Sequence, residues 1–323
     1  NVVRKVGGAL AAGCTITIKP SEETPGTAIA IGRAFMEAGL PPGVLNIVFG
    51  VPSEVSEYLC SSNIPRKLSF TGSVPVGKHL QKLAAENMIR CTMELGGHSP
   101  LMVFNDTDIE KAAQISVAGK FRNAGQVCVS PTRFLVQDDI KDKFTQAVIE
   151  ETNKIKVGNG LEDDTNMGPL IAERRIDVMN DFVKDAIDNG ANIEMGGNRM
   201  NRVGSFFSPT VMTGVDDSAK IMNEEPFGPL LPIDTFKSVD EVIDRANRLD
   251  FGLASYAFTN DPKIVDNLRS EIQAGLLAVN STVVSTPETP FGGIKHSGYG
   301  SEGGVEGLEA FLVTRFVSET YNI

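Results

Sequence analysis

Two residues of this chain carry the chemistry of a nucleophile and a general base. Cys128 lies in the segment Asn123-Ala-Gly-Gln-Val-Cys-Val-Ser130, and Glu94 directly precedes Leu95-Gly96-Gly97. A thiolate can attack a carbonyl carbon, and a carboxylate at the carboxyl edge of an α/β sheet can remove a proton from water. Each residue also has an ordinary alternative, because an isolated cysteine is often a core thiol and a glutamate at a strand end is often solvated.

A third segment could bind phosphate. Phe70-Thr-Gly-Ser-Val-Pro-Val-Gly77 places two glycines, Gly72 and Gly77, around a predicted junction of strand and helix. Backbone N–H groups at such a helix start, together with the Ser73 hydroxyl, can hold a pyrophosphate. A plain strand-to-helix turn would use the same glycines, and the pattern is not GxGxxG, so both interpretations stay open.

The composition limits the class of protein. With 323 residues and 41% apolar residues, the chain is long enough for two domains. A net charge of -11 would repel nucleic acid. The four cysteines and three histidines show no metal-ligand spacing, so free thiols and no metal are expected. No signal peptide and no apolar run long enough to span a membrane are recognised, which predicts a cytoplasmic protein without membrane contact.

Alternating strand and helix patterns predict a doubly wound α/β fold with a parallel sheet. Before residue 97 the predicted strands are 15–19, 44–49, 67–71 and 89–94, and the predicted helices start at Pro25, at Ser53 and after Ser73. A strand over 101–104 follows, then a helix that Asp106 or Thr107 caps and Gly125 ends. Residues 286–300 are predicted to be a long loop, and 310–317 a strand that pairs with another subunit.

The spacing of the two reactive residues resembles a known family. Met93-Glu-Leu-Gly-Gly97, followed 34 residues after its glutamate by Gly125-Gln-Val-Cys128, is similar to the paired signatures of the aldehyde dehydrogenase superfamily. Four further blocks resemble that family in the same order, namely 9–25, Phe70-Thr-Gly-Ser73, Glu224-Glu-Pro-Phe-Gly-Pro229 and Pro290-Phe-Gly-Gly-Ile-Lys295. The resemblance implies an incomplete cofactor domain over 1–96, a catalytic domain over 97–296, and a return to the cofactor domain with an oligomerisation strand over 297–323.

The resemblance also implies roles for the reactive residues. Cys128 matches the nucleophile that forms a thiohemiacetal with the aldehyde and then a thioester, and its backbone N–H matches one oxyanion donor. Glu94 matches the base that activates water for hydrolysis of the thioester. Glu302 resembles a second glutamate that relays protons.

For the cofactor, the family pattern implies a bound dinucleotide. Lys19 and Glu22 match residues that hold the adenosine ribose, whereas Gly72 and Ser73 match the pyrophosphate site. Leu95 also matches a cofactor-binding residue, and Glu225 and Phe227 match residues that hold the nicotinamide ribose and ring. A carboxylate at Glu22 would repel a 2′-phosphate, so NAD is expected rather than NADP.

Three residues favour a carboxylated substrate. Arg122 and Arg4 match residues that clamp the distal carboxylate in enzymes similar to succinate-semialdehyde dehydrogenases, and Ser285 matches the accompanying hydroxyl. A guanidinium can bind a carboxylate through two hydrogen bonds. The alternatives are that Arg122 pairs with the carboxyl end of its own helix and that Arg4 is solvated. Ser130 stands where a redox-switch cysteine occurs in some members, so no local disulfide switch is expected.

Some features leave other functions open. The family places a Pro-Trp-Asn block and much of the cofactor domain before the position where this sequence starts, so we expect a fragment of a longer protein that lacks one oxyanion donor. A CoA-acylating enzyme is disfavoured by Glu94. A non-catalytic structural or binding protein on the same fold is disfavoured by the retained reactive residues. The expected partners are a small aldehyde and further copies of the chain in a homodimer or homotetramer.

Overall fold

The computed structural model describes residues 1–321, which fall into two compact units. The first unit contains residues 1–94, 285–292 and the segment from Tyr299 onward, and the second contains residues 95–284 and 293–298. The last two residues of the predicted 297–323 segment lie outside the described residues. Each unit is described below by itself.

The first unit alternates short strands with helices, as the sequence predicts. Its elements are α1 (Val2–Ala11), β1 (Ile16–Ile18), α2 (Pro25–Glu37), β2 (Leu45–Ile47), α3 (Pro52–Ser61), β3 (Lys67–Thr71), α4 (Val74–Glu86), β4 (Arg90–Glu94) and α10 (Gly304–Glu309). Strand β1 pairs in parallel with β2, and β3 pairs in parallel with β4. Proline occupies the first turn of α2, α3 and α4, where its missing N–H costs no hydrogen bond.

The second unit is built on a seven-stranded sheet with the order β12-β11-β5-β6-β9-β8-β7. Its strands are β5 (Ser99–Val103), β6 (Pro131–Gln137), β7 (Asn192–Met195), β8 (Thr210–Thr213), β9 (Leu230–Phe236), β11 (Ala254–Phe258) and β12 (Leu276–Val279). Neighbouring strands run parallel except for the β7–β8 pair at one edge. Every residue of β5 and β11 is buried, as expected for a parallel sheet that is covered on both faces.

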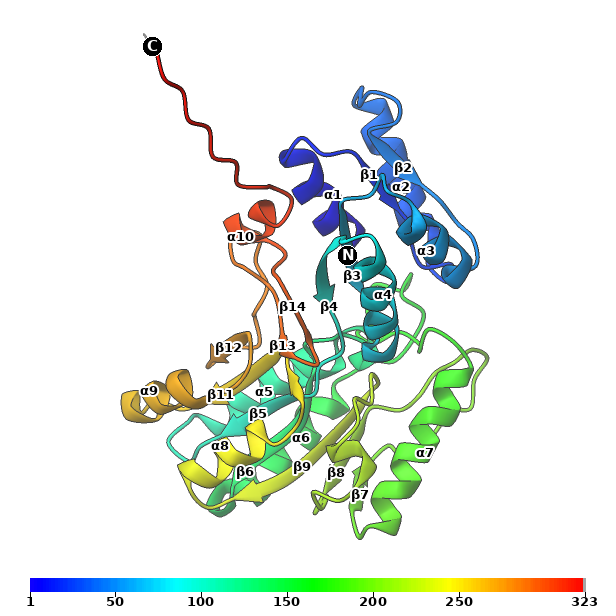
Figure 1. Cartoon of the computed structure of the whole chain (residues 1–323). Coiled ribbons are helices and arrows are strands. Elements are labelled where there is room, and N and C mark those ends of the chain that lie inside the picture. Colours follow the sequence, from blue (N-terminus) through cyan, green and yellow to red (C-terminus); the bar gives the residue numbers. More distant parts are fainter. Residues whose placement is uncertain (322–323) are drawn as a thin grey trace. The chain divides into compact units, whose positions relative to one another are not determined.

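Helices cover both faces of this sheet. The helices of the second unit are α5 (Ile109–Phe121), α6 (Lys141–Asn153), α7 (Arg174–Asp188), α8 (Val239–Asn247) and α9 (Pro262–Glu271). Helix α5 leads from β5 to β6, whereas α8 leads from β9 back to β11, so right-handed crossovers place them on opposite faces. Helix α6 packs against α5 and α9 against α8 (Figure 1). No helix within residues 1–321 is long and apolar enough to cross a membrane.

Helix α5 differs from its prediction at both ends. Its cap is Asp108, which accepts the N–H of Lys111 at 3.1 Å, and not Asp106 or Thr107. The Asp106 carboxylate is used elsewhere, because it accepts the backbone N–H of Asn260 at 2.7 Å. The α-helix ends at Phe121 rather than at Gly125, and a short 3₁₀ segment, Arg122–Gly125, follows it.

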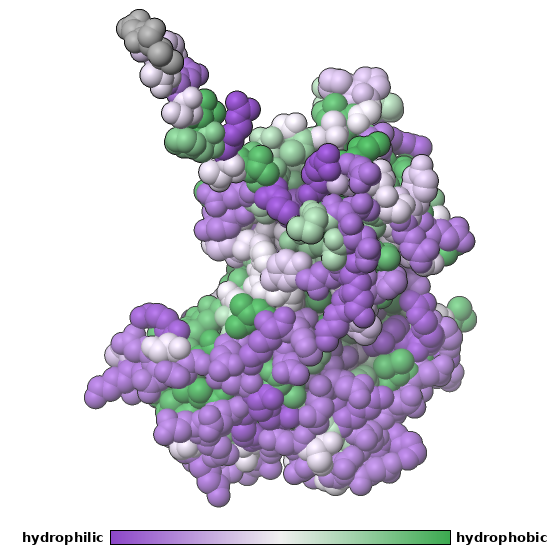
Figure 2. All heavy atoms as spheres, viewed as in Figure 1, coloured by the Kyte–Doolittle hydropathy of each residue, from purple (hydrophilic) through white to green (hydrophobic). Residues whose placement is uncertain are grey.

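The C-terminal predictions also need correction. The predicted loop over 286–300 contains two short strands, β13 (Ile294–Lys295) and β14 (Gly298–Tyr299), and β13 pairs with β10 (Phe251–Gly252). The predicted strand over 310–317 is absent from the described part of the chain, which is irregular after residue 311. A strand needs a hydrogen-bonding neighbour, and the neighbour predicted for this segment belongs to another subunit, so the pairing itself stays a prediction. Its Val313 and Phe316 side chains are exposed, and Figure 2 shows green hydrophobic atoms along it.

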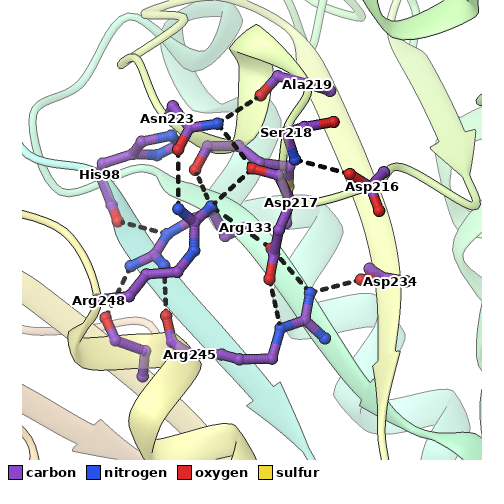
Figure 3. Close-up of polar contacts among 12 residues, drawn as sticks. His98, Arg133, Asp216, Asp217, Ser218, Ala219, Asn223, Asp234, Arg245 and Arg248 are labelled. Carbon is purple, nitrogen blue, oxygen red and sulfur yellow. Dashed lines mark hydrogen bonds and ion pairs between the residues drawn. The ribbon is translucent and has the colours of Figure 1, made fainter. Parts of the chain in front are cut away.

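A buried arginine ties the central strand of the second unit to a helix end. Arg133 of β6 is 2% exposed and donates three hydrogen bonds, from Nε to His98 O at 3.1 Å, from Nη1 to Arg245 O at 2.8 Å and from Nη2 to Ala246 O at 2.9 Å (Figure 3). The last two acceptors lie at the carboxyl end of α8, whose final carbonyls have no partner within the helix. Arg133 therefore satisfies carbonyls that the sheet and the helix leave unpaired.

Arg245 and Arg248 lie beside Arg133 and, together with it, form an arginine cluster next to the loop before β9. Arg245 bridges Asp217 at 2.9 Å and Asp234 at 2.5 Å. Arg248 donates to Asn223 Oδ1 at 2.8 Å and to Met222 O at 2.6 Å. Figure 3 shows the Asp217 carboxylate on one side of the Arg245 guanidinium and Asp234 on the other. The cluster holds the chain just before Glu224.

We expect the substitution Arg133→Met to lower the free energy of unfolding by about 2–4 kcal/mol, because it leaves three buried carbonyl oxygens without a donor. Urea denaturation followed by circular dichroism would measure the change. The matched control is Arg269→Met, which removes only an exposed ion pair with Asp266 and should cost less than about 1 kcal/mol. Equal effects of the two substitutions would show that the buried hydrogen bonds of Arg133 add no more to the free energy of unfolding than an exposed ion pair does.

Candidate active site

Cys128 follows a turn that is left-handed at three consecutive residues. The φ angles of Asn123, Ala124 and Gly125 are 52°, 55° and 70°. Non-glycine residues in this region cost about 1 kcal/mol or more each, so the surrounding structure must hold them there. Asn123 and Gln126 exchange side-chain-to-backbone hydrogen bonds of 3.1 Å in both directions. The turn redirects the chain from α5 toward Cys128.

Close backbone packing fixes both ends of this turn. A Cβ atom on Gly125 would lie 2.1 Å from the carbonyl oxygen of Gly228, and one on Gly97 would lie 2.6 Å from the carbonyl oxygen of Cys128. Neither position tolerates a side chain without movement of the backbone. Cys128 itself is half-buried.

Buried polar side chains support the residues after Cys128. The Tyr256 hydroxyl donates to Val129 O at 2.6 Å, and burial raises the pKa of Tyr256, an effect that the nearby Cys128 reinforces. Ser130 is buried and donates to Lys120 O at 3.3 Å. Within residues 1–321, none of the four cysteines forms a disulfide.

Glu94 is the last residue of β4, as predicted, and its carboxyl group lies in the first unit without a hydrogen-bond partner among the described residues. The residue is 3% exposed, and both carboxyl oxygens are buried. Burial, reinforced by the negative charge of Glu302, raises the pKa of Glu94 to about 8. A buried carboxyl group that has no hydrogen-bond partner and whose pKa lies near neutral pH has the properties of a general base.

Glu302 lies close to Glu94 but has a different environment. It is 7% exposed, forms an ion pair with Lys5 of α1 and accepts the Ser69 hydroxyl at 3.0 Å. Both contacts hold the Glu302 carboxyl group in place. The two glutamates therefore differ, since Glu302 is held by partners and Glu94 is not.

The structure brings two of the three predicted substrate residues together. Arg4 Nη2 donates to Ser285 Oγ at 2.6 Å, and the Arg4 guanidinium lies 4.4 Å from the centre of the Phe291 ring. All three residues belong to the first unit. Arg122 belongs to the second unit, where its side chain is exposed at the start of the 3₁₀ segment rather than in the last turn of α5.

The predicted cofactor residues of the first unit form two groups. Lys19 Nζ and Glu22 Oε2 are 2.5 Å apart, and the Glu22 side chain is 56% exposed. Gly72 and Ser73 precede α4, and the N–H of Gly72 donates to Glu94 O at 3.1 Å. The Ser73 hydroxyl makes no capping hydrogen bond, so it is available at the helix start for a phosphate oxygen. Both groups fit a dinucleotide.

Of the predicted cofactor residues of the second unit, Glu225 contacts the backbone of Gly96 and Gly97, which directly follow Leu95. Glu225 accepts the Gly97 N–H at 3.4 Å, and a Cβ atom on Gly96 would lie 2.5 Å from Glu225 Oε2. The Leu95 N–H donates to Ser297 O at 3.0 Å, which fixes the same stretch from its other end. Burial raises the pKa of Glu225 to about 7. These contacts fix the backbone at the position where the family resemblance predicts the nicotinamide half of a dinucleotide.

Phe227 is held in a strained conformation by an arginine. Its φ angle is 43°, and Arg175 of α7 donates from Nη2 to Pro226 O at 2.5 Å and to Phe227 O at 3.4 Å. The positive charge of Arg175 also opposes the effect of burial on the pKa of Glu225. Arg175 thus fixes the segment that carries both predicted nicotinamide residues.

Sequence reasoning missed several residues that support the site: Lys5, Ser69, Lys120, Arg175, Tyr256 and Ser297. Most of them lie far along the chain from the groups that they contact, so no local spacing could reveal them. Only Lys5 offered a signal, because it adjoins Arg4. No group of three or more potential metal-ligand side chains occurs within the described residues.

Comparison with known proteins supports a single family. The sequence profile described as the aldehyde dehydrogenase family matches residues 1–317. The chain is 45% identical over 314 residues to a 4-(hydroxymethyl)benzenesulfonate dehydrogenase of Comamonas testosteroni, covering 97% of this chain and 65% of that protein. It is 40% identical over 316 residues to the NADP(+) succinate-semialdehyde dehydrogenase of Escherichia coli, covering 98% of this chain and 66% of that protein.

The fold agrees with these sequence matches. A crystal structure of succinate-semialdehyde dehydrogenase from Burkholderia pseudomallei superimposes with a TM-score of 0.95 at 40% identity, covering 97% of this chain and 65% of that one. The α/β fold predicted from the sequence is therefore confirmed. The chain spans about 65% of the length of the first curated relatives that it matches.

We expect Glu94→Gln to flatten the dependence of stability on pH. Because the pKa of Glu94 is about 8 in the folded chain and near 4.5 when exposed, the folded state binds its proton more tightly. The free energy of unfolding should therefore fall as pH rises from 4.5 to 8, with a contribution of up to about 1.4 kcal/mol per pH unit. Urea denaturation at several pH values would measure this slope.

The control for this measurement is Glu309→Gln, which changes an exposed carboxylate of α10. It should leave the slope unchanged. An unaltered slope in Glu94→Gln would show that Glu94 titrates as an exposed glutamate does.

Proposed function

The chain belongs to the aldehyde dehydrogenase family, and from this premise we propose that the protein oxidises an aldehyde to the acid with NAD(P) as hydride acceptor. The observation that carries the proposal is Glu94, a buried carboxyl group with two unpaired oxygens and a pKa of about 8. Burial of an unpaired carboxyl group is costly, and a structural role would supply partners for it. A general base needs this environment.

In the proposed reaction, the Cys128 thiolate adds to the aldehyde carbon. The carbonyl oxygen becomes an oxyanion, which the Cys128 backbone N–H can stabilise. A bound nicotinamide would accept the hydride from the former aldehyde carbon. That loss converts the adduct into a thioester on Cys128.

Glu94 acts in the second half of the reaction. It removes a proton from water, the resulting hydroxyl attacks the thioester carbon, and the carbon–sulfur bond breaks. The acid leaves, and Cys128 is again a thiolate. Glu302, which Lys5 and Ser69 hold close to Glu94, is the residue that we propose passes the proton onward.

The proposed substrate is a small aldehyde with an anionic group at its far end. The Arg4–Ser285 pair presents a guanidinium and a hydroxyl together, and Arg122 offers a second, exposed guanidinium. Guanidinium groups bind both carboxylates and sulfonates. The names of two relatives match this chemistry, since one refers to succinate semialdehyde and the other to a benzenesulfonate. A carboxylated, succinate-semialdehyde-like substrate remains our first choice.

We propose NAD rather than NADP as the preferred cofactor. Glu22 is exposed and paired with Lys19, so its carboxylate can accept hydrogen bonds from ribose hydroxyls. A 2′-phosphate at the same position would meet a negative charge. The E. coli relative is named for NADP(+), so this preference belongs to the present chain and requires its own measurement.

We also propose that the protein acts in the cytoplasm as a homodimer or homotetramer. The exposed apolar residues Leu312, Val313 and Phe316 lie in an irregular segment with backbone groups available for a strand. Pairing of this segment with another copy would satisfy those groups and cover the apolar side chains.

The function is tested by following dinucleotide reduction with the purified protein at its natural length. Succinate semialdehyde, an aromatic sulfonated aldehyde and an uncharged aldehyde of similar size should each be assayed with NAD and with NADP. We expect oxidation without added CoA, faster with the anionic aldehydes and with NAD, and a loss of at least about 10³-fold in Cys128→Ala. A Cys128→Ala variant as active as the natural protein would refute the proposal.

Arg122→Leu should discriminate between charged and uncharged substrates. We expect kcat/KM for succinate semialdehyde to fall about 10- to 100-fold, since a charge-assisted hydrogen bond contributes about 1.5–3 kcal/mol. The value for the uncharged aldehyde should stay within about twofold. Arg90→Leu, an exposed arginine of β4, is the control. A parallel loss for both substrates would contradict the role of Arg122 in binding the anionic group.

A further inference from the structure

Cys128 lies at the corner of a tight turn that spans residues 127–130. The N–H of Ser130 donates to the carbonyl oxygen of Val127 at 2.9 Å, which is the hydrogen bond that closes a β-turn. Because a peptide group is planar and trans, the N–H of Cys128 points in the direction opposite to the Val127 carbonyl, away from the interior of the turn. The turn therefore sets the direction of the group that would donate to an oxyanion.

Two distant segments hold this turn from outside. A Cβ atom on Gly97 would lie 2.6 Å from the carbonyl oxygen of Cys128, so the backbone of Gly97 packs directly against the turn. The Tyr256 hydroxyl donates to the carbonyl oxygen of Val129 at 2.6 Å, across 127 positions of sequence. The first contact limits the position of the turn, and the second fixes the orientation of one of its peptide groups.

Tyr256 is a costly residue at its position in β11. It is fully buried, as are the other residues of this strand. A buried hydroxyl costs free energy unless it has a hydrogen-bond partner, and phenylalanine would fill the same space without that cost. Phe258, on the same strand, is a buried aromatic residue of this kind. The hydrogen bond to Val129 is what the tyrosine hydroxyl adds.

The surroundings of Tyr256 keep its hydroxyl a donor. Burial raises the pKa of Tyr256 above its ordinary value, and the charge of Cys128 raises it further, whereas Arg122 has a smaller opposite effect. The phenol therefore keeps its proton at neutral pH. Since a thiolate on Cys128 strengthens this effect, Tyr256 can donate to Val129 O whether Cys128 is protonated or ionised.

We propose that Tyr256 is a positioning residue that holds the 127–130 turn, and with it the Sγ and N–H groups of Cys128, in the orientation needed for attack on the aldehyde. This inference rests on the proposed function, because it takes Cys128 as the nucleophile. Tyr256 acts through the backbone of Val129. An oxyanion donor and a nucleophile contribute most when they are fixed before the reaction, so loss of the hydroxyl should slow the chemical step and leave dinucleotide binding unchanged.

The first test compares the kinetics of Tyr256→Phe and of the unsubstituted protein, both at natural length. This substitution keeps the ring and removes only the hydroxyl. With the fastest aldehyde of the substrate panel, we expect kcat to fall about tenfold, the effect of one lost orienting hydrogen bond. The KM for the aldehyde and the Kd for NAD, measured by calorimetry, should each stay within about twofold.

Phe258→Leu is the matched control for stability. It removes part of a buried ring from the same strand and should lower the free energy of unfolding, but kcat should stay within about twofold. Tyr58→Phe removes a hydroxyl from an exposed tyrosine of α3 and should change neither quantity. If kcat falls with stability in Phe258→Leu as it does in Tyr256→Phe, the loss reflects stability alone and the proposal is wrong.

Amide hydrogen exchange tests the turn without any substrate. We expect the peptide that contains Ser130 to exchange at least about fivefold faster in Tyr256→Phe, because the Ser130 N–H is exposed to solvent when the turn opens. Peptides from β8, which is not adjacent to β11 in the sheet, should exchange at an unchanged rate. Should Tyr256→Phe fail to fold, Tyr256→Met, which also lacks the hydroxyl, replaces it in both measurements.

The two measurements together separate this proposal from the proposed function. Faster exchange with an unchanged kcat, or a lower kcat with unchanged exchange, would overturn the positioning role of Tyr256. If the unsubstituted protein oxidises no aldehyde of the panel, the proposed function is refuted and the catalytic role of Tyr256 with it. Faster exchange in Tyr256→Phe would in that case still establish that Tyr256 holds the turn.

Discussion

The contact between Gly125 and the carbonyl oxygen of Gly228 is the constraint on which the site of the second unit depends. Only a missing side chain allows the two backbones to approach, because a Cβ atom at Gly125 would lie 2.1 Å from that oxygen. The contact joins the turn that leads to Cys128 and the segment that carries Glu225 and Phe227. The proposed nucleophile and the proposed nicotinamide residues are thus held together by backbone rather than by flexible side chains. The strained φ angles on both sides of the contact persist because this packing over-determines them.

Buried charges divide into two kinds in this protein. Each of the three Arg133 guanidinium nitrogens donates to a carbonyl oxygen, which is the environment of a charge that stabilises the fold. Glu94 and Lys120 are equally buried, but their charged atoms have no hydrogen-bond partners within the described residues. The pKa of a buried ionisable group without partners depends strongly on nearby charges and on solvent, so such a group can take up or release a proton during a reaction. The distinction separates structural arginines from candidate functional groups without reference to any other protein.

Much of the local structure was predictable because it depends on neighbouring residues. Prolines mark the first turns of α2 and α4, and the segment 67–71, in which polar and apolar residues alternate, forms β3 with the predicted bounds. The errors arose where a distant contact competes with a local signal. Asp106 is a good capping residue by type, but Asn260 uses its carboxylate, and Asp108 caps α5 instead. The segment 310–317 is irregular in the single chain, and its pairing with another subunit stays a prediction.

The sequence by itself determined the family and the α/β fold and predicted the reactive residues, because each depends on residue types at fixed spacings along the chain. The Arg4–Ser285 pair was predicted in the same way and is formed in the structure. Only the tertiary structure decided which charges are buried and which groups face them. The pKa of Glu94, the partners of Glu302 and the burial of Lys120 depend on the packing of residues that are distant in sequence. Electrostatic interactions act through space, so their strength follows from the fold and not from the order of residues.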